Sequence, residues 1–238
     1  MEKKAYYESR TSDLSCWNDE NQKRTLQFPA HLHPHIEIVY FLEGEVTAYA
    51  DSVAYPLRPG DIFVVFPNQV HRYVTRTAER FFILIVNPEW ISELAHVFIS
   101  SLPVSSLLRG EENLKLFALF QAIHQEYSCS GTYHEAILKG YLLAFLGQLL
   151  QRLTLDLPRT SQAPAVKMIL DFCARNYTRT LYLKTLSEEL HLSQYYISHL
   201  FSTKLNLHFN DYINSLRVSS ACRDLCRSDQ SIIKYNSI

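Results

Sequence analysis

Paired cysteines are missing from this sequence. Its 238 residues include five cysteines, an odd number, and no two of them form a CxxC pair. This usage is typical of reduced thiols in a cytosolic protein and does not support a disulfide framework. Cys222 and Cys226 stand four residues apart in a segment expected to be helical, which leaves a thiol switch open as an alternative.

Long apolar runs are missing as well. The most apolar stretch, residues 141–150, contains Gln148 and is too short for a membrane-spanning helix, which needs about 20 apolar residues. The opening residues Met1-Glu2-Lys3-Lys4 lead into polar sequence instead of the apolar core of a signal peptide. We therefore expect a cytoplasmic protein with no membrane partner. Because 47% of its residues are hydrophobic, the chain can bury a core, which argues against disorder.

The net charge of −1 conceals a difference between the two ends of the chain. From residue 162 onward there are nine Lys or Arg and six Asp or Glu, a net charge of +3. Residues 1–161 hold 14 and 18, a net charge of −4. A basic tail behind an acidic body suits a nucleic-acid contact confined to one end.

Residues 26–87 have the composition of β-strands. Short runs rich in β-branched and aromatic residues are separated by turn signals such as Glu43-Gly44-Glu45 and Pro67-Asn68. The strands expected from these runs lie at 36–42, 45–50, 61–66 and 80–86. Several short strands at close spacing predict a sandwich or a barrel. Residues 1–25 are expected to be a loose arm with one edge strand.

After Asn87-Pro88 the pattern becomes helical. Helices are expected at 89–100, 111–127 and 133–153. The last helix has a wide apolar surface and a row of small residues at Ala136, Gly140, Ala144 and Gly147. Because such a face needs two partners, we expect it to pack on the barrel and on a second subunit, with burial inside one subunit as the alternative. Two prolines around polar residues predict a linker at 157–164.

The most informative stretch is 181–225, which predicts a helix-turn-helix followed by a long helix. Apolar residues recur at helical spacing through 183–190 and again through 194–204. The turn between them is His191-Leu192-Ser193, in which the Ser193 hydroxyl can accept from unpaired amides of the second helix. Two short helices joined in this way can place one helix in the major groove of DNA.

This stretch resembles the DNA-binding unit of the AraC/XylS-type transcriptional regulators. The residues that carry the resemblance are Leu186-Ser187-Glu188-Glu189-Leu190, Leu192-Ser193, Tyr196-Ile197-Ser198, Leu200-Phe201, Phe209, Tyr212-Ile213, Leu216-Arg217, Ala221 and Leu225. The resemblance implies a regulator with an N-terminal sensor and a unit of two helix-turn-helix motifs. Residues 231–238 stand where the second motif should begin, so we expect this chain alone to bind DNA weakly or only as a dimer.

The second helix of the motif is the expected DNA-reading element. Ile197, Leu200 and Phe201 should face the core, which leaves the other side of the helix for DNA. Gln194 can bind adenine through two hydrogen bonds, and polar neighbours can reach phosphates or base edges. The predicted DNA-binding residues are Gln194, Tyr195, Ser198, His199, Ser202 and Lys204. A solvated helix face is the alternative for each of them.

The second informative pattern is His31-Leu32-His33-Pro34-His35-Ile36-Glu37, followed by Gly44, Pro59-Gly60-Asp61 and His71. This H-x-H-x3-E pattern with a later histidine resembles the two motifs of the cupin barrel over about residues 26–87. In metal-binding cupins these positions hold Fe, Mn, Zn or Ni. The resemblance therefore implies His31, His33, Glu37 and His71 as the ligands if a metal is bound.

We nevertheless predict no metal cofactor, because the regulators that this chain resembles commonly keep a metal-free cupin-like sensor. A small polar effector, for example a sugar, is expected at the barrel mouth. Its predicted binding residues are His31, His33, Glu37, Tyr40, His71 and Tyr73. A purely structural role for these residues is the remaining alternative.

These patterns predict an α+β fold in three parts. A cupin-like sensing barrel with its arm is expected at 1–110, a helical dimerisation module at 111–157, and a helix-turn-helix domain at 158–238. The predicted function is a ligand-responsive transcriptional regulator, not an enzyme, that binds double-stranded DNA as a homodimer through helices in 111–153. The alternatives are a metal-dependent cupin enzyme and a dimerising protein that silences full-length relatives without strong DNA binding.

Overall fold

The computed structural model describes residues 5–8, 10–18, 25–51, 53–110, 113–156, 165–205 and 207–227. The strands are β1 (Tyr6–Tyr7), β2 (Leu14–Asn18), β3 (Phe28–Leu32), β4 (Ile36–Glu43), β5 (Val46–Ala50), β6 (Val53–Pro56), β7 (Ile62–Val65), β8 (His71–Thr75), β9 (Arg80–Val86), β10 (Leu102–Pro103), β11 (Leu107–Leu108) and β12 (Leu155–Asp156). The helices are η1 (Pro88–Ile91), α2 (Ser92–Ser100), α3 (Leu114–Tyr127), α4 (His134–Arg152), α5 (Ala165–Asn176), α6 (Leu183–Leu190), α7 (Gln194–Leu200), the π-helical turn η3 (Phe201–Leu205) and α8 (Phe209–Arg227). The linker expected at 157–164 and the second motif expected from 231 lie outside the described residues.

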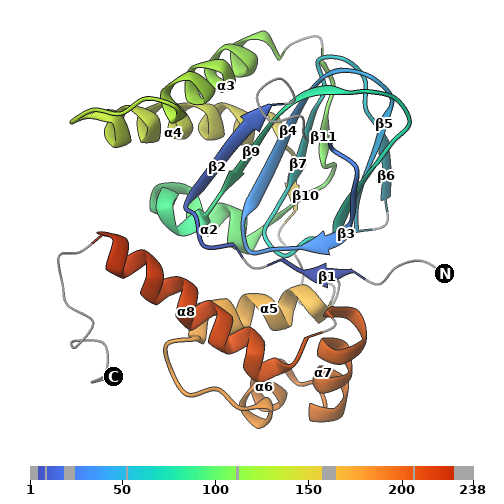
Figure 1. Ribbon diagram of the computed structural model, residues 1–238. Helices are drawn as coiled ribbons and strands as arrows, with labels where there is room; N and C mark the ends of the chain where they lie inside the picture. The colour runs from blue at the N-terminus through green and yellow to red at the C-terminus, as the bar shows by residue number, and fades with distance from the viewer. Residues whose placement is uncertain are drawn as a thin grey trace.

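Two five-stranded sheets build the N-terminal part of the molecule (Figure 1). Their strand orders are β1-β3-β8-β5-β6 and β11-β7-β4-β9-β2. β1 runs parallel to β3, whereas the other strand pairs of these two sheets are antiparallel. The inner faces share a buried core that contains Val39, Phe41, Ala48, Phe63 and Ile85. The α+β fold with an N-terminal β domain and a following helical domain is therefore confirmed.

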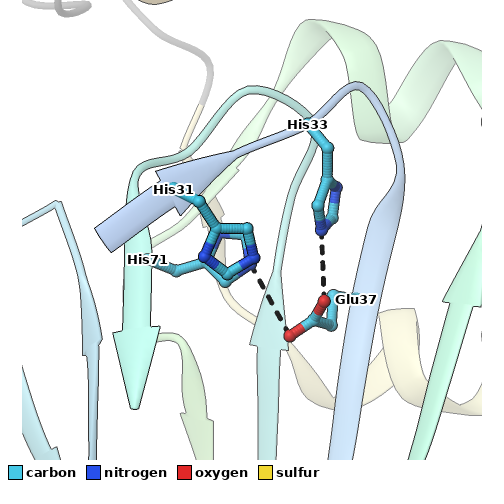
Figure 2. A group of neighbouring side chains, drawn as sticks. All are labelled: His31, His33, Glu37 and His71. Carbon is cyan, nitrogen blue, oxygen red and sulfur yellow. Dashed lines mark hydrogen bonds and ion pairs between the residues drawn. The ribbon is translucent and has the colours of Figure 1, made fainter. Parts of the chain in front are cut away.

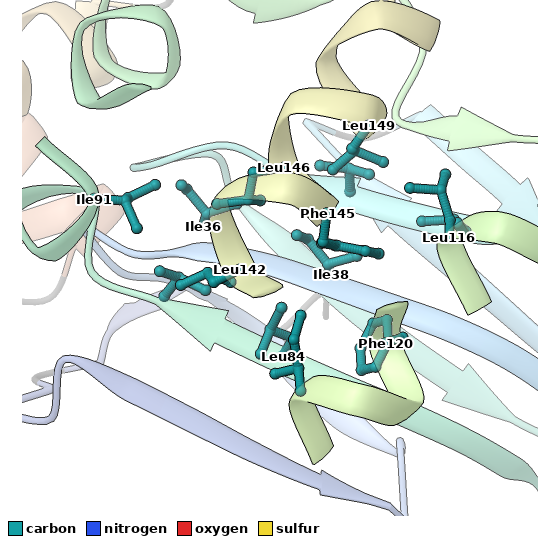
Figure 3. Packing of buried hydrophobic residues seen from close by; sticks show 14 of the residues in the cluster. Ile36, Ile38, Leu84, Ile91, Leu116, Phe120, Leu142, Phe145, Leu146 and Leu149 are labelled. Carbon is teal, nitrogen blue, oxygen red and sulfur yellow. The ribbon is translucent and has the colours of Figure 1, made fainter. Parts of the chain in front are cut away.

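β4 divides its side chains between two cores because successive residues of a strand point to opposite faces. Val39 and Phe41 point between the two sheets, whereas Ile36, Ile38 and Tyr40 point to the outer face of their sheet. Figure 3 shows the outer face, where Ile36 and Ile38 meet side chains from α3 and α4. The strand is buried on both faces, which explains its nearly continuous apolar sequence.

α3 and α4 cover this outer face and share one hydrophobic core with the sheet. The core includes Phe120 of α3 and Leu142, Phe145, Leu146 and Leu149 of α4, each fully buried. The boundary expected at residue 110 therefore does not separate two cores. One stripe of α4 stays outside this packing, and it carries Ile137 and Tyr141, which are 44% and 38% exposed.

The helical domain is built from α5, α6, α7 and α8 around its own core, which includes Ile169, Leu186, Ile197, Phe201 and Tyr212. α6 spans the expected residues 183–190, and it ends at His191 in the left-handed conformation. Ser193 caps α7 as expected, since its hydroxyl accepts from the Tyr196 amide at 3.1 Å. The helix expected to reach 204 is α-helical only to Leu200 and continues as the π-helical turn η3.

The helical domain packs against the end of the barrel where β1 and β3 lie (Figure 1). Hydrogen bonds between the parts include one from Asn68 Nδ2 to Asp171 Oδ1 at 3.0 Å and one from Lys167 Nζ to the Pro67 carbonyl at 3.2 Å. Asn68, Lys167 and Asp171 are all buried, and Lys167 also pairs with Asp171 at 3.0 Å. Nothing in the local sequence patterns predicts this contact.

Among the described helices, none has the length and apolar character that crossing a membrane requires.

Candidate functional site

Four polar side chains meet inside the barrel, next to the helical domain. They come from three segments: His31 and His33 from β3 and the turn that follows it, Glu37 from β4, and His71 from β8 (Figure 2). One nitrogen or oxygen from each of the four lies within 4.8 Å of the others. None of these residues is more than 2% exposed. We refer to His31, His33, Glu37 and His71 as the His/Glu cluster.

Strand geometry explains why these residues meet. His31 and His71 are direct partners in the antiparallel pair of β3 and β8, so their side chains share one face of the sheet. His33 follows two residues after His31 and lies on the same side, with Leu32 on the opposite side. After the turn at Pro34 the chain enters β4 in the other sheet, and Glu37 points from there toward the histidines.

The three histidines have the same hydrogen-bond arrangement. Each Nδ1 lies beside a backbone carbonyl: Pro29 for His31 at 2.9 Å, His35 for His33 at 3.2 Å, and Gln69 for His71 at 3.0 Å. Because a carbonyl only accepts, each Nδ1 must carry the proton. In a neutral ring this leaves Nε2 with its lone pair directed into the cluster. Metal-binding histidines are usually oriented by such an outer hydrogen bond.

Two acceptors surround His33, which is the chemically informative feature of the cluster. Its Nδ1 faces a carbonyl, and its Nε2 lies 3.1 Å from Glu37 Oε2. Both nitrogens can donate only if the ring is a buried imidazolium, yet burial, the largest influence, lowers the pKa of His33. A cation between Nε2 and the carboxylate would satisfy the neutral ring instead. His71 Nε2, which is buried, has no hydrogen-bond partner and lies 3.6 Å from Glu37 Oε1.

Protonation states in the cluster also favour a cation. Burial is the main influence that lowers the pKa of His31, to about 3, so this ring is neutral. Burial alone would raise the pKa of Glu37, but its interactions with His71 and His33 outweigh burial and hold this pKa well below its ordinary value. Tyr73 donates to Glu37 Oε1 at 2.6 Å. The cluster thus holds an ionised carboxylate among imidazoles, a donor set suited to a divalent transition metal.

The spacing of the cluster fits one ion after a small contraction. Bonds from such a metal to nitrogen or oxygen are about 2.0–2.2 Å long, so two ligands on opposite sides of it lie at most about 4.4 Å apart. The four ligand atoms already lie within 4.8 Å of one another. In a tetrahedral site the ligand atoms lie about 3.3–3.6 Å apart, so completing the coordination would need the widest pair to close by about 1 Å.

Of the six residues predicted to bind an effector, the structure brings five together. Tyr73 joins the His/Glu cluster through its hydrogen bond to Glu37. Tyr40 does not: its ring stacks on Phe117 of α3 at 4.6 Å, in the core on the outer face of the sheet. The placement of Tyr40 in the barrel pocket was wrong, because residues three apart on a strand point to opposite faces.

The residues predicted to bind DNA lie on one exposed side of α7 and its continuation. Gln194, Tyr195, Ser198, His199 and Ser202 are all exposed, and Tyr195 is 80% exposed with its ring stacked on His199 at 5.9 Å. Ile197 and Leu200 point into the core, as expected. The side chain of Lys204 is not among those described.

Sequence reasoning missed a residue that contacts the cluster and a group that joins the two parts of the chain. Tyr6 of β1 stacks on the His31 ring, with 5.8 Å between centroids. Asn68, Lys167 and Asp171 make the interdomain contacts. None of them belongs to a recognisable motif. The one local signal is the residue type of Asn68, because Asn tolerates the left-handed backbone conformation that this residue adopts, with a φ of 64°.

Known proteins resemble this chain to different extents. Residues 20–146 match the model of the AraC-like ligand binding domain. An HTH-type transcriptional regulator of Bacillus subtilis, YbfI, is 25% identical over 207 residues, which is 82% of this chain and 72% of that protein. ToxT from Vibrio cholerae is 13% identical, with a TM-score of 0.46 over 92% of this chain and 85% of that chain. An RmlC-like cupin from Shewanella frigidimarina is 32% identical over 24% of this chain and 50% of its own, with a TM-score of 0.23.

The family match covers more than half of the chain, and it includes both sheets except β1 and β2, all of α3 and most of α4. The helix-turn-helix of α6 and α7 follows it in the order expected for a sensor and its DNA-binding unit. The chain therefore belongs to the AraC-type transcriptional regulators, with an AraC-like ligand-binding domain at its N-terminal end.

Proposed function

We propose that this chain is a transcriptional regulator whose effector is a divalent transition-metal ion held by the His/Glu cluster. The observation that carries the proposal is the convergence of three imidazoles and one carboxylate, all buried, with ligand atoms within 4.8 Å. The Nδ1-to-carbonyl hydrogen bonds support it, because they orient each Nε2 toward the centre. The spacing suits an ion, whereas a sugar would need the cluster to open.

Burial of the cluster supports sensing over catalysis. The helical domain packs over this end of the barrel, and each cluster residue is at most 2% exposed. An enzyme of the cupin type needs its metal to be accessible to an organic substrate as well as to its protein ligands. An ion that only has to be bound needs no such access in the closed conformation. The proposed role of the metal is therefore to change the conformation of the chain.

DNA recognition is proposed for the exposed side of α7. Gln194→Ala should weaken binding to a selected operator by about 1–3 kcal/mol, because a bidentate contact to adenine is lost, while non-specific binding stays unchanged. The measurement is fluorescence anisotropy of the purified chain on a genomic fragment pool, followed by the selected fragment, across a salt series. Gln125→Ala is the matched control, since Gln125 is exposed on α3.

Two results would contradict this assignment. Equal losses from the Gln194 and Gln125 variants would place the DNA contact elsewhere. A chain that dimerises but binds no fragment selectively would favour the alternative of a dimerising protein that silences its relatives.

Dimerisation is proposed through the exposed stripe of α4. Ile137 and Tyr141 project there beside Gly140, where an added side-chain carbon would meet nothing within 4 Å. Tyr141→Glu should raise the dimer dissociation constant about tenfold or more, because a charge would be buried in an apolar contact. Sedimentation equilibrium measures this constant. Tyr182→Glu is the matched control, since Tyr182 is 65% exposed on the helical domain; the same effect from both variants would rule out the stripe.

A further inference from the structure

The strand that supplies two ligands of the His/Glu cluster also supplies a core residue of the helical domain. His31 and His33 point into the cluster, whereas Leu32, between them, is fully buried in the core formed by α5, α6, α7 and α8. Leu32 thus lies in a hydrophobic cluster with Ile169, Leu170 and Tyr212, more than 130 residues later in the chain. Consecutive residues of this one extended segment therefore contact the His/Glu cluster on one side and the core of the helical domain on the other.

β1 repeats this arrangement beside β3. Tyr6 stacks on His31 with 5.8 Å between ring centroids and 26° between ring planes. Its neighbour Tyr7 meets the edge of the Tyr212 ring at 4.9 Å, at the start of α8. The two strands pair in parallel register, Tyr6 with His31 and Tyr7 with Leu32. Tyr6 and His31 therefore both lie on the side of the His/Glu cluster, and Tyr7 and Leu32 both lie on the side of the helical domain.

The third ligand-bearing segment also reaches both parts. His71 belongs to the cluster, Val70 packs against the core of the helical domain, and Asn68 donates to Asp171 of α5. The segments that carry all three histidines are therefore seated on the helical domain. Glu37 comes from the opposite sheet, so an ion that draws the four ligands together pulls these segments toward β4.

We propose that β1 and β3 couple metal binding at the His/Glu cluster to the seating of the helix-turn-helix domain on the barrel. The coupling rests on the proposed function, since it takes a metal ion as the occupant of the cluster. A strand is stiff along its length, so a shift of His31 or His33 by a few tenths of an ångström moves Leu32 within a close-packed core. Contraction of the cluster around an ion thus changes the equilibrium constant for packing of the helix-turn-helix domain on the barrel. By reciprocity, this packing changes the affinity for the metal by the same factor.

The coupling predicts a response in helices that do not touch the metal. In hydrogen exchange of the full chain, Co²⁺ alone should slow amide exchange in α5 and α8 about fivefold or more. The visible spectrum of Co²⁺ reports binding separately. Glu37→Gln should lose both the spectrum and the protection. Tyr7→Ala should keep the spectrum and lose most of the protection, because Tyr7 touches Tyr212 but not the cluster.

Leu32→Ala tests the same link more strongly, because Leu32 is fully buried. If the Leu32 variant does not fold, Tyr7→Ala decides the question, because Tyr7 is only half-buried on a two-residue strand. Co²⁺ binding without altered exchange in α5 and α8 would overturn the coupling and leave the metal site intact. Absence of Co²⁺ binding would overturn the metal site. In that case His31→Ala decides the coupling without metal: faster exchange in α8 would support it, and unchanged exchange would overturn it.

Discussion

Glu37→Gln is expected to lower the affinity of the chain for a divalent transition-metal ion about 100-fold or more. Glu37 is the only acidic residue of the His/Glu cluster, and its charge acts in a buried site where water screens it little. Glutamine keeps the shape of the side chain and can still accept from Tyr73, so the fold should survive. Titration with Co²⁺ followed by visible absorption, and metal content by mass spectrometry after dialysis, measure the loss.

Tyr40→Phe is the control for this experiment. Tyr40 lies on the same strand, three residues along, but its ring is on the opposite face against Phe117. Its substitution should leave both metal affinity and stoichiometry unchanged. If Glu37→Gln binds the ion as tightly as the natural chain, the carboxylate is not a ligand, and the cluster is a structural hydrogen-bond network.

Phe145→Ala is expected to reduce the free energy of unfolding by about 3–5 kcal/mol, as large-to-small changes of buried aromatic residues do. Phe145 is fully buried between α4 and the outer face of the sheet. Its ring meets the edge of Phe120 at 5.3 Å, so the variant leaves a cavity between both helices and β4. Urea unfolding followed by circular dichroism and by tryptophan fluorescence measures the change.

The two probes should change together, because α3, α4 and the sheet share one core and should unfold as one unit. Ile137→Ala, on the exposed side of the same helix, should cost less than about 1 kcal/mol in the monomer. A comparable cost for both variants would mean that subunit contacts, rather than the sheet, hold α4 in place.

Local sequence determined the elements whose signals are contained within a few residues. The spacing of apolar residues placed α6 at 183–190, and a run of β-branched and aromatic residues placed β9 at 80–86. Ser193 identified the start of α7, because a cap needs only a hydroxyl two or three residues before the amides it satisfies. The H-x-H-x3-E spacing identified three members of the cluster through its resemblance to the cupin motif, and strand alternation explains why His31 and His33 lie on one side.

The same alternation was available for Tyr40 and shows how a local rule can be overlooked. Tyr40 and Glu37 differ by an odd number of positions on one strand, so they cannot share a face. Chemical type had suggested a pocket residue, whereas register decided its place against α3. β8 was not identified as a strand, because its mixed polar residues weaken the alternating pattern. β2 matches the edge strand expected within residues 1–25.

Only the tertiary structure decided what lies next to the cluster. Asn68 and Asp171 are 103 residues apart, and Leu32 completes a core built from α5 to α8. Periodicity records which side of an element is apolar, but it does not record which distant surface covers that side. The free energy that seats the helix-turn-helix domain on β1 and β3 comes from contacts between distant segments. Those contacts exist only after both parts have folded, and they place the helix-turn-helix domain and the His/Glu cluster on two sides of the same strands.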